Sequence, residues 1–188
     1  MDNFSALILV ASAALIAAHG VVMRLRQAKR EAVSAARRPS MHVSPSWLFV
    51  WSALVAACLE WWLPTSRALT PLWFWLATGV ALAATAEGFM RSAGRTLQRH
   101  ATTQDAARVA DVLVDEGLFG ATRNPIYLGM LLLFLGVAVA AGSLWALALL
   151  PGYFLALHLL VVRPEEAALR QRFGERYQRY AAAVPRYF

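Results

Sequence analysis

The sequence has little charge and a single cysteine. Charged residues make up 15% of the 188 residues and apolar residues 59%, whereas a soluble domain has about 25% charged and about 45–50% apolar residues. This composition argues against a soluble globular protein and against a disordered chain. Because Cys58 stands alone, the sequence offers neither an intramolecular disulfide nor a Cys-x-x-Cys metal site.

Several nucleotide-binding and catalytic motifs are missing as well. The chain has no Gly-x-Gly-x-x-Gly, no P-loop and no Gly-x-Ser-x-Gly, so any nucleotide-like cofactor would be held by something other than a Rossmann fold. No spacing of His, Cys and Glu residues indicates a metal site.

The apolar residues fall into five blocks. They cover residues 4–23, 46–63, 71–90, 125–141 and 144–162, each close to the about 20 residues that a membrane-crossing helix needs. None contains Lys or Arg, and each is apolar on all sides instead of alternating with a period of two, which favours helices over strands. We therefore predict an all-α integral membrane protein with five transmembrane helices.

Positive charge is confined to one side of these predicted helices. All but one of the 18 Lys and Arg residues follow the first, third or fifth block, and Arg67 alone lies between the second and third. Since positive residues stay cytoplasmic, we expect the N-terminus outside and the C-terminus in the cytoplasm. The basic groups suit anionic lipid headgroups, so the net charge of +7 requires no nucleic acid partner.

The first segment with candidate site residues leads into the fourth block. Asn124 is a favoured helix N-cap and Pro125 a favoured first helical residue, so a helix should begin here. The free N–H groups at such an end can bind a carboxylate or phosphate, and the guanidinium of Arg123 beside it has a fork suited to a carboxylate. Tyr127 and Gly129 follow within the first turn and a half.

A structural interpretation of this segment is equally open. Arg123 and Asn124 are also what a membrane-edge arginine and an ordinary cap would look like. Gly129 and Gly136 would then be positions where two helices pack closely.

The second candidate segment follows the fifth block. Pro164 is expected to end the fifth helix and to open a new one, in which arginines surround a single apolar face. That face, at spacings of four, four and three, consists of Leu169, Phe173, Tyr177 and Tyr180. A basic amphipathic helix of this kind is typical of the membrane surface.

Two acidic residues open this segment. Glu165 and Glu166 would place two carboxylates at the membrane edge, where they can bind a cationic or hydroxyl-rich ligand. Alternatively, both complement a helix N-terminus, and Glu166 pairs with Arg170 four residues on.

Two further acidic residues lie inside apolar blocks. Glu87 is a functional candidate because ionisable residues within a membrane usually serve function, and its alternative is an ion pair with Arg91. Glu60 lies near the outer end of the second block, where an interfacial position explains it.

Together, the two segments resemble the superfamily of isoprenylcysteine carboxyl methyltransferases and phospholipid N-methyltransferases, which are small integral-membrane enzymes. The resemblance covers roughly residues 88–188. Its first half consists of Gly117, Arg123, Asn124, Pro125, Tyr127 and Gly129, and its second of Arg163, Glu165, Glu166, Leu169, Phe173, Gly174, Tyr177, Tyr180, Val184 and Pro185.

The resemblance implies S-adenosylmethionine as methyl donor, bound near the cytoplasmic face of a bacterial inner membrane. It implies that the donor is held by Arg123, Asn124, Pro125, Tyr127, Gly129, Glu165 and Glu166. A carboxylate acceptor would need no general base, and Arg123 would orient it. An amine acceptor would need one, for which Glu87 and Glu166 are the candidates.

The sequence thus predicts one membrane domain, residues 1–188, with three helices in 1–90 and a methyltransferase-like region in 91–188. We expect carboxyl O-methylation of an amphiphilic acceptor, with lipid amine N-methylation as the alternative. A transporter using Glu87 and a non-catalytic scaffold are rivals from other classes. The sequence does not indicate an oligomeric state.

Overall fold

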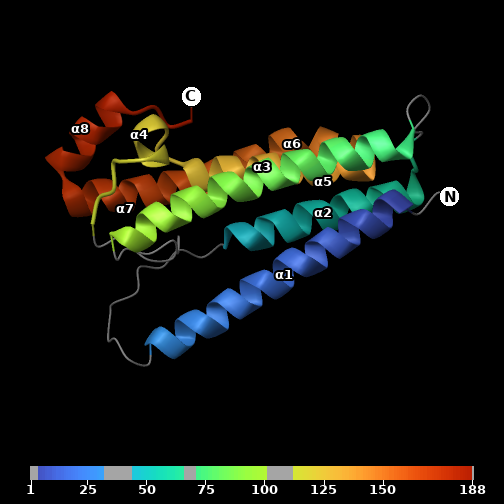
Figure 1. Cartoon of the computed structure of the whole chain (residues 1–188), viewed down its shortest axis with the longest axis horizontal. Coiled ribbons are helices and arrows are strands. Elements are labelled where there is room, and N and C mark those ends of the chain that lie inside the picture. Colours follow the sequence, from blue (N-terminus) through green and yellow to red (C-terminus); the bar gives the residue numbers. More distant parts are fainter. Residues whose placement is uncertain (1–3, 32–43, 66–70, 101–111, 188) are drawn as a thin grey trace.

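The computed structural model describes residues 4–31, 44–65, 71–100 and 112–187, with the backbone alone for 23–31 (Figure 1). These residues form helices and contain no strand. The five apolar blocks lie in helices, which confirms the all-α part of the predicted fold class. The corresponding helices are α1 (Phe4–Glu31), α2 (Pro45–Trp62), α3 (Leu72–Arg99), α5 (Pro125–Ala141) and α6 (Leu144–Leu157).

Among the described residues, three helical segments are long and apolar enough to cross a membrane. They are Phe4–Val22, Leu72–Arg99 and Leu144–Phe173. Helices α2 and α5 are shorter, with 18 and 17 residues; at 1.5 Å per residue α5 is about 26 Å long, against a hydrocarbon core of about 30 Å. Five crossings and the side of each terminus therefore stay predictions.

Helices α3 and α5 pack against each other through glycines. A Cβ atom on Gly79 would lie 2.5 Å from the carbonyl oxygen of Gly136, and one on Gly129 would lie 2.5 Å from Cγ of Met90. Only glycine permits this approach of two backbones. The close packing fixes the start of α5 beside the second half of α3.

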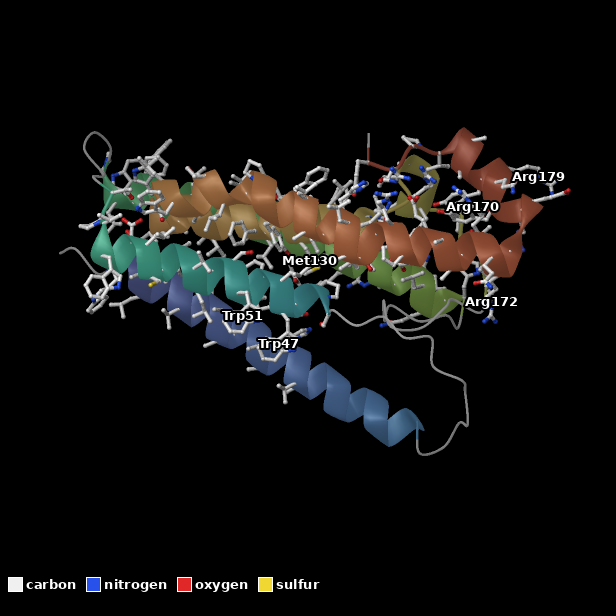
Figure 2. The ribbon with its side chains drawn as sticks, turned by 180° about the vertical axis from the view of Figure 1, so that it is seen from behind. Trp47, Trp51, Met130, Arg170, Arg172 and Arg179 are labelled. Carbon is white, nitrogen blue, oxygen red and sulfur yellow. The ribbon has the colours of Figure 1, made fainter. Side chains whose placement is uncertain are left out.

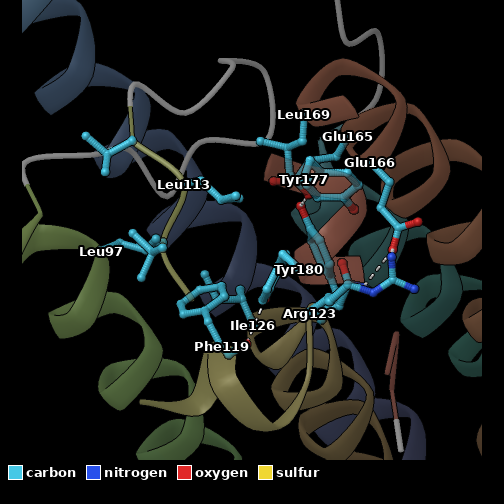
Figure 3. A pocket seen from close by; sticks show the side chains of 14 residues that line it. Leu97, Leu113, Phe119, Arg123, Ile126, Glu165, Glu166, Leu169, Tyr177 and Tyr180 are labelled. Carbon is cyan, nitrogen blue, oxygen red and sulfur yellow. Dashed lines mark hydrogen bonds and ion pairs between the residues drawn. The ribbon is translucent and has the colours of Figure 1, made fainter. Parts of the chain in front are cut away.

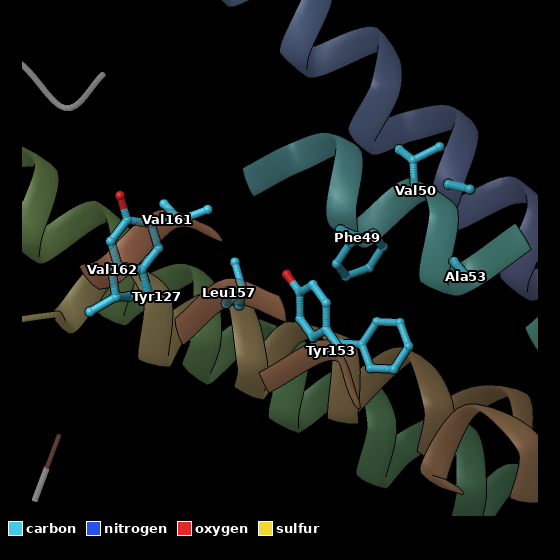
Figure 4. Packing of buried hydrophobic residues seen from close by; sticks show 10 residues of the cluster. Phe49, Val50, Ala53, Tyr127, Tyr153, Leu157, Val161 and Val162 are labelled. Atoms are coloured by element: carbon cyan, nitrogen blue, oxygen red, sulfur yellow. The ribbon is translucent and has the colours of Figure 1, made fainter. Parts of the chain in front are cut away.

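An aromatic core joins α5 to α2 and α6. The ring of Phe134 lies 5.4 Å from that of Phe49 and 4.8 Å from that of Tyr153, measured between centroids (Figure 4). All three side chains are buried, and such aromatic pairs add to the free energy gained by burial.

The helix that begins as α6 does not end at Pro164, so that prediction is wrong. It continues through a π-helical turn, η1 (His158–Val162), into α7 (Arg163–Phe173). In a regular α-helix the ring of Pro164 would clash with the carbonyl four residues earlier. The wider turn just before the proline, closed by a bond from Arg163 N–H to the carbonyl of His158, carries the helix past it.

The predicted amphipathic helix is in fact two helices. Gly174, at φ +53°, separates α7 from α8 (Glu175–Ala183), a backbone conformation that favours glycine. The apolar face packs on the protein, where Tyr177 and Tyr180 form a buried cluster with Leu113 and Val184. The apolar face is therefore covered by the protein itself, and a location of this segment at the membrane surface stays a prediction.

Glu60 marks the opposite end of the bundle. It is 1% exposed, and its carboxylate accepts hydrogen bonds from the hydroxyl of Ser143 (2.7 Å) and the backbone N–H of Thr65 (2.8 Å). Glu60 thus ties α2 to the turn between α5 and α6. Its interfacial position in a membrane stays a prediction.

Candidate active site

A pocket opens at the end of the bundle where α3 ends, α5 begins and α7 and α8 turn back (Figures 1 and 3). Figure 2 shows Arg170, Arg172 and Arg179 at this same end. The pocket is lined by Leu97, Val112, Leu113, Val114, Phe119, Arg123, Asn124, Ile126, Tyr127, Glu165, Glu166, Leu169, Tyr177 and Tyr180. Five of the predicted site residues are among them.

The two predicted segments meet directly. The hydroxyl of Tyr127, in the first turn of α5, donates a hydrogen bond of 2.7 Å to Oε2 of Glu165, in the first turn of α7. The side chain of Tyr127 is buried and Glu165 is half-buried. This bond joins residues 38 positions apart in the sequence, so the juxtaposition on which the sequence interpretation depended is present.

Glu166, which is part of the pocket lining, lies at the centre of a polar cluster. It is 5% exposed, and Arg186 binds it with two hydrogen bonds, from Nε to Oε1 (3.0 Å) and from Nη2 to Oε2 (2.7 Å). Nη1 of Arg123 lies farther away, 3.5 Å from Oε1. The hydrogen bond to Glu166 raises the pKa of Arg186. Protein groups therefore already engage both oxygens of Glu166.

Asn124 begins α5 as predicted, with Pro125 as the first helical residue, but its side chain does not cap the helix. Instead, its Nδ2 donates to the backbone carbonyl of Arg186 (3.1 Å) and to Oε1 of Glu166 (3.4 Å). The backbone N–H of Arg123 donates to the carbonyl of Pro185 (3.0 Å). The entry to α5 is thus held by the end of the chain.

The C-terminal residues are the part of the site that sequence analysis missed. Thr122 donates a hydrogen bond to the carbonyl of Arg186 (3.1 Å), and the hydroxyl of Tyr187 lies 2.9 Å from Nδ1 of His158. The only sequence signal was that the resemblance ends on Val184 and Pro185, immediately before these residues.

Tyr177 and Tyr180 are also part of the pocket. The sequence placed them on the apolar face and among the residues of the resemblance, but assigned them no role in the site. The hydroxyl of Tyr180 donates to the carbonyl of Phe119 (2.7 Å). Burial raises the pKa of both tyrosines, so each is a neutral hydrogen-bond donor at physiological pH.

Three predicted site residues lie outside the pocket lining. Pro125 and Gly129 face the helix packing, and for Gly129 this is the structural alternative that the sequence left open. Glu87 forms an ion pair with Arg91, 2.7 Å between Oε1 and Nε, with exposed fractions of 46% and 68%. That pair is the alternative we gave for Glu87, and its role as a general base stays a prediction.

Comparison with known proteins identifies the family. Residues 74–176, more than half of the chain, match the family model described as phospholipid methyltransferase. Searches of curated proteins and of solved structures gave no significant match. The matched range runs from α3 through both segments that meet in the pocket. The chain therefore belongs to the phospholipid methyltransferase family, which implies a membrane methyltransferase.

Proposed function

We propose that the protein is an S-adenosylmethionine-dependent methyltransferase that acts on an amphiphilic acceptor at the cytoplasmic face of a bacterial inner membrane. The single observation that carries this proposal is the contact between the start of α5 and the acidic start of α7 in one pocket. The family match supports methyl transfer as the reaction. The restriction of basic residues to the predicted cytoplasmic segments supports the orientation.

The residues of the pocket fit the chemical groups of S-adenosylmethionine. Arg123 provides a cationic donor for its carboxylate, and Glu165 provides an acceptor for its cationic groups or ribose hydroxyls. Leu97, Phe119 and Leu169 provide apolar surface for the adenine. A site of mostly apolar walls with a few convergent polar groups is typical of small-molecule binding.

The protein's own contribution is to position the reactants. When bound, S-adenosylmethionine supplies a methyl carbon to which the acceptor's lone pair bonds, while the electron pair of the broken carbon–sulfur bond stays on sulfur. Holding two reactants in line can supply much of a rate enhancement. Glu166 serves this purpose indirectly, because it holds Arg123 and Arg186 in place.

Two acceptor classes follow from different observations. The two motif segments favour carboxyl O-methylation by resemblance, which needs no general base. The family match favours a lipid amine, which must lose a proton. For that case we assign Glu165 as proton acceptor, because it lines the pocket and Glu166 is already bound by Arg186.

The test is methyl transfer by the purified protein in phospholipid vesicles, with methyl-labelled S-adenosylmethionine. One reaction contains a prenylcysteine analogue and the other phosphatidylethanolamine as acceptor. Treatment with alkali releases a methyl ester as volatile methanol but leaves an N-methyl group attached, so the product identifies the acceptor class. The proposal requires transfer to one of them that Glu165→Gln lowers by at least about tenfold.

Two results would contradict the proposal. A transporter or scaffold would transfer no label to either acceptor. Transfer that Glu165→Gln leaves unchanged would separate the activity from this pocket. Glu175→Gln is the matched control, since Glu175 is an exposed acidic residue outside the pocket lining.

A further inference from the structure

Two buried hydrogen-bond donors in the pocket lack an acceptor. The hydroxyl of Tyr177 and Nε of Arg123 are both inaccessible to solvent, and neither has a hydrogen-bond partner among the residues that the structure describes. Tyr177 is 1% exposed and lines the pocket beside Glu165 and Glu166 (Figure 3). Since nearly all buried polar groups in proteins are hydrogen-bonded, this pair requires an explanation.

Arg123 can donate to the hydroxyl oxygen of Tyr177, but it cannot supply the acceptor that the hydroxyl proton lacks. A guanidinium has only donors and accepts no hydrogen bond, so Arg123 cannot accept the hydroxyl proton of Tyr177. The nearby carboxylate of Glu166 already receives two hydrogen bonds from Arg186 and one from Asn124. An acceptor on a bound molecule in the pocket would satisfy the hydroxyl proton of Tyr177.

Tyr180 shows that a buried tyrosine on this helix can have an acceptor within the protein. Tyr180, three residues along the same helix and also buried, donates its hydroxyl proton to the carbonyl of Phe119 at 2.7 Å. The fold thus provides a backbone acceptor for the hydroxyl of Tyr180, whereas it provides none for the hydroxyl of Tyr177 among the described residues.

We propose that Tyr177 Oη–H and Arg123 Nε–H together bind the carboxylate of the amino-acid head of S-adenosylmethionine. A cationic donor beside a neutral one matches a carboxylate, which accepts several hydrogen bonds and carries one negative charge. Because burial raises the pKa of Tyr177, its proton is retained at physiological pH. This inference rests on the proposed function and adds Tyr177 to the donor-binding residues.

The experiment measures binding by calorimetry, without acceptor and without turnover. Two ligands are titrated into the purified protein: S-adenosylmethionine, and its decarboxylated analogue, which keeps the sulfonium, the amine and the adenosine. Wild type should bind S-adenosylmethionine at least about tenfold more tightly than the analogue. Tyr177→Phe should lose about tenfold for S-adenosylmethionine and change less than about twofold for the analogue.

Tyr180→Phe is the matched control, because it removes a hydroxyl that a backbone carbonyl already engages. It should change both affinities by the same factor. The comparison of the two ligands on wild type needs no variant, so it remains informative if a substitution impairs folding.

Each failure has a distinct meaning. If wild type binds neither ligand, the proposed function fails and this inference fails with it. If wild type binds S-adenosylmethionine but Tyr177→Phe weakens both ligands equally, or neither, the proposed function stands and the role of Tyr177 is refuted. Equal affinity of wild type for the two ligands would refute a carboxylate subsite altogether.

Discussion

At the scale of single residues, the carboxylate of Glu166 is engaged by three side chains, those of Arg186, Arg123 and Asn124. Its carboxylate is 7% exposed and faces the guanidiniums of Arg186 and Arg123. Removing one partner of a buried ion pair leaves an uncompensated charge and costs about 3–5 kcal/mol. Because Arg186 is 38% exposed, water can compensate part of that loss.

We therefore expect Glu166→Gln to lower the free energy of unfolding by about 2–3 kcal/mol. The measurement is reversible denaturation in mixed micelles, followed by tryptophan fluorescence. Glu87→Gln makes the same change in an exposed pair with Arg91 and should cost less than about 0.5 kcal/mol. Equal effects of the two substitutions would refute the central position of Glu166.

The partner of Glu166 shows what sequence reasoning misses at this scale. Helical spacing offered Arg170, four residues on, whereas the structure pairs Glu166 with Arg186, twenty residues on. Between them lies Gly174, whose positive φ ends α7 and redirects the chain. The spacing of four residues predicts ion pairs within one helix, such as that of Glu87 and Arg91. It cannot predict a pair that forms only because the chain changes direction between the two residues.

At the scale of helices, the contact between α3 and α5 positions the site. Small residues let the two backbones approach, and the resulting alignment sets where Arg123 and Tyr127 lie relative to α7. A side chain at Gly79 must push the helices apart, because the closest atoms that it would meet belong to the backbone of α5.

Gly79→Ala should accordingly destabilise the protein by about 1–3 kcal/mol. Its Cβ would lie 2.5 Å from both the carbonyl oxygen of Gly136 and the backbone nitrogen of Ala140. Gly88→Ala, on the same helix, meets nothing within 4 Å and should be neutral or stabilising by up to about 1 kcal/mol. Thermal unfolding in detergent compares the two, and a Gly79→Ala protein as stable as wild type would contradict the close packing.

Apolar blocks predicted the helices well because burial and length decide them. The same pattern could not anticipate the π-helical turn before Pro164 or the break at Gly174. Proline normally ends a helix. Here the helix continues past Pro164 because the backbone hydrogen bonds of the preceding turn change register, and no side-chain pattern indicates such a change. The role of Gly174 was likewise hidden, because a continuous amphipathic period runs across it.

At the scale of the whole molecule, the bundle has two different ends. The pocket and the described arginines lie where α5 begins, and the turn around Ser143 lies at the other end (Figure 2). The charge pattern predicts that the pocket end is cytoplasmic.

Labelling of single cysteines tests this orientation. In a Cys58→Ala background, Leu144→Cys and Arg176→Cys each introduce a thiol at an exposed position at opposite ends. In intact cells an impermeant maleimide should label Leu144→Cys only, and Arg176→Cys should react only after permeabilisation. The reverse pattern would place the pocket on the outer side and contradict the proposed localisation.

The sequence located the site because its two halves are marked by local motifs at the start of α5 and of α7. It could not predict the contacts of Arg186 with Glu166 and of Tyr187 with His158. These contacts depend on the tertiary fold and leave no regular spacing in the sequence. The role of the Tyr177 hydroxyl was not predicted either: the resemblance included Tyr177, but its helical position indicated an apolar face and no hydrogen bond to a ligand.

The central claim is that the start of α5 and the start of α7 bind one methyl donor. Ultraviolet cross-linking of labelled S-adenosylmethionine to the purified protein, followed by mass mapping of the labelled peptides, tests it most directly. We predict label in peptides covering residues 112–127 and 163–180, displaced by excess unlabelled donor. Displaceable label confined to α1 and α2, or the absence of any displaceable label, would contradict the account.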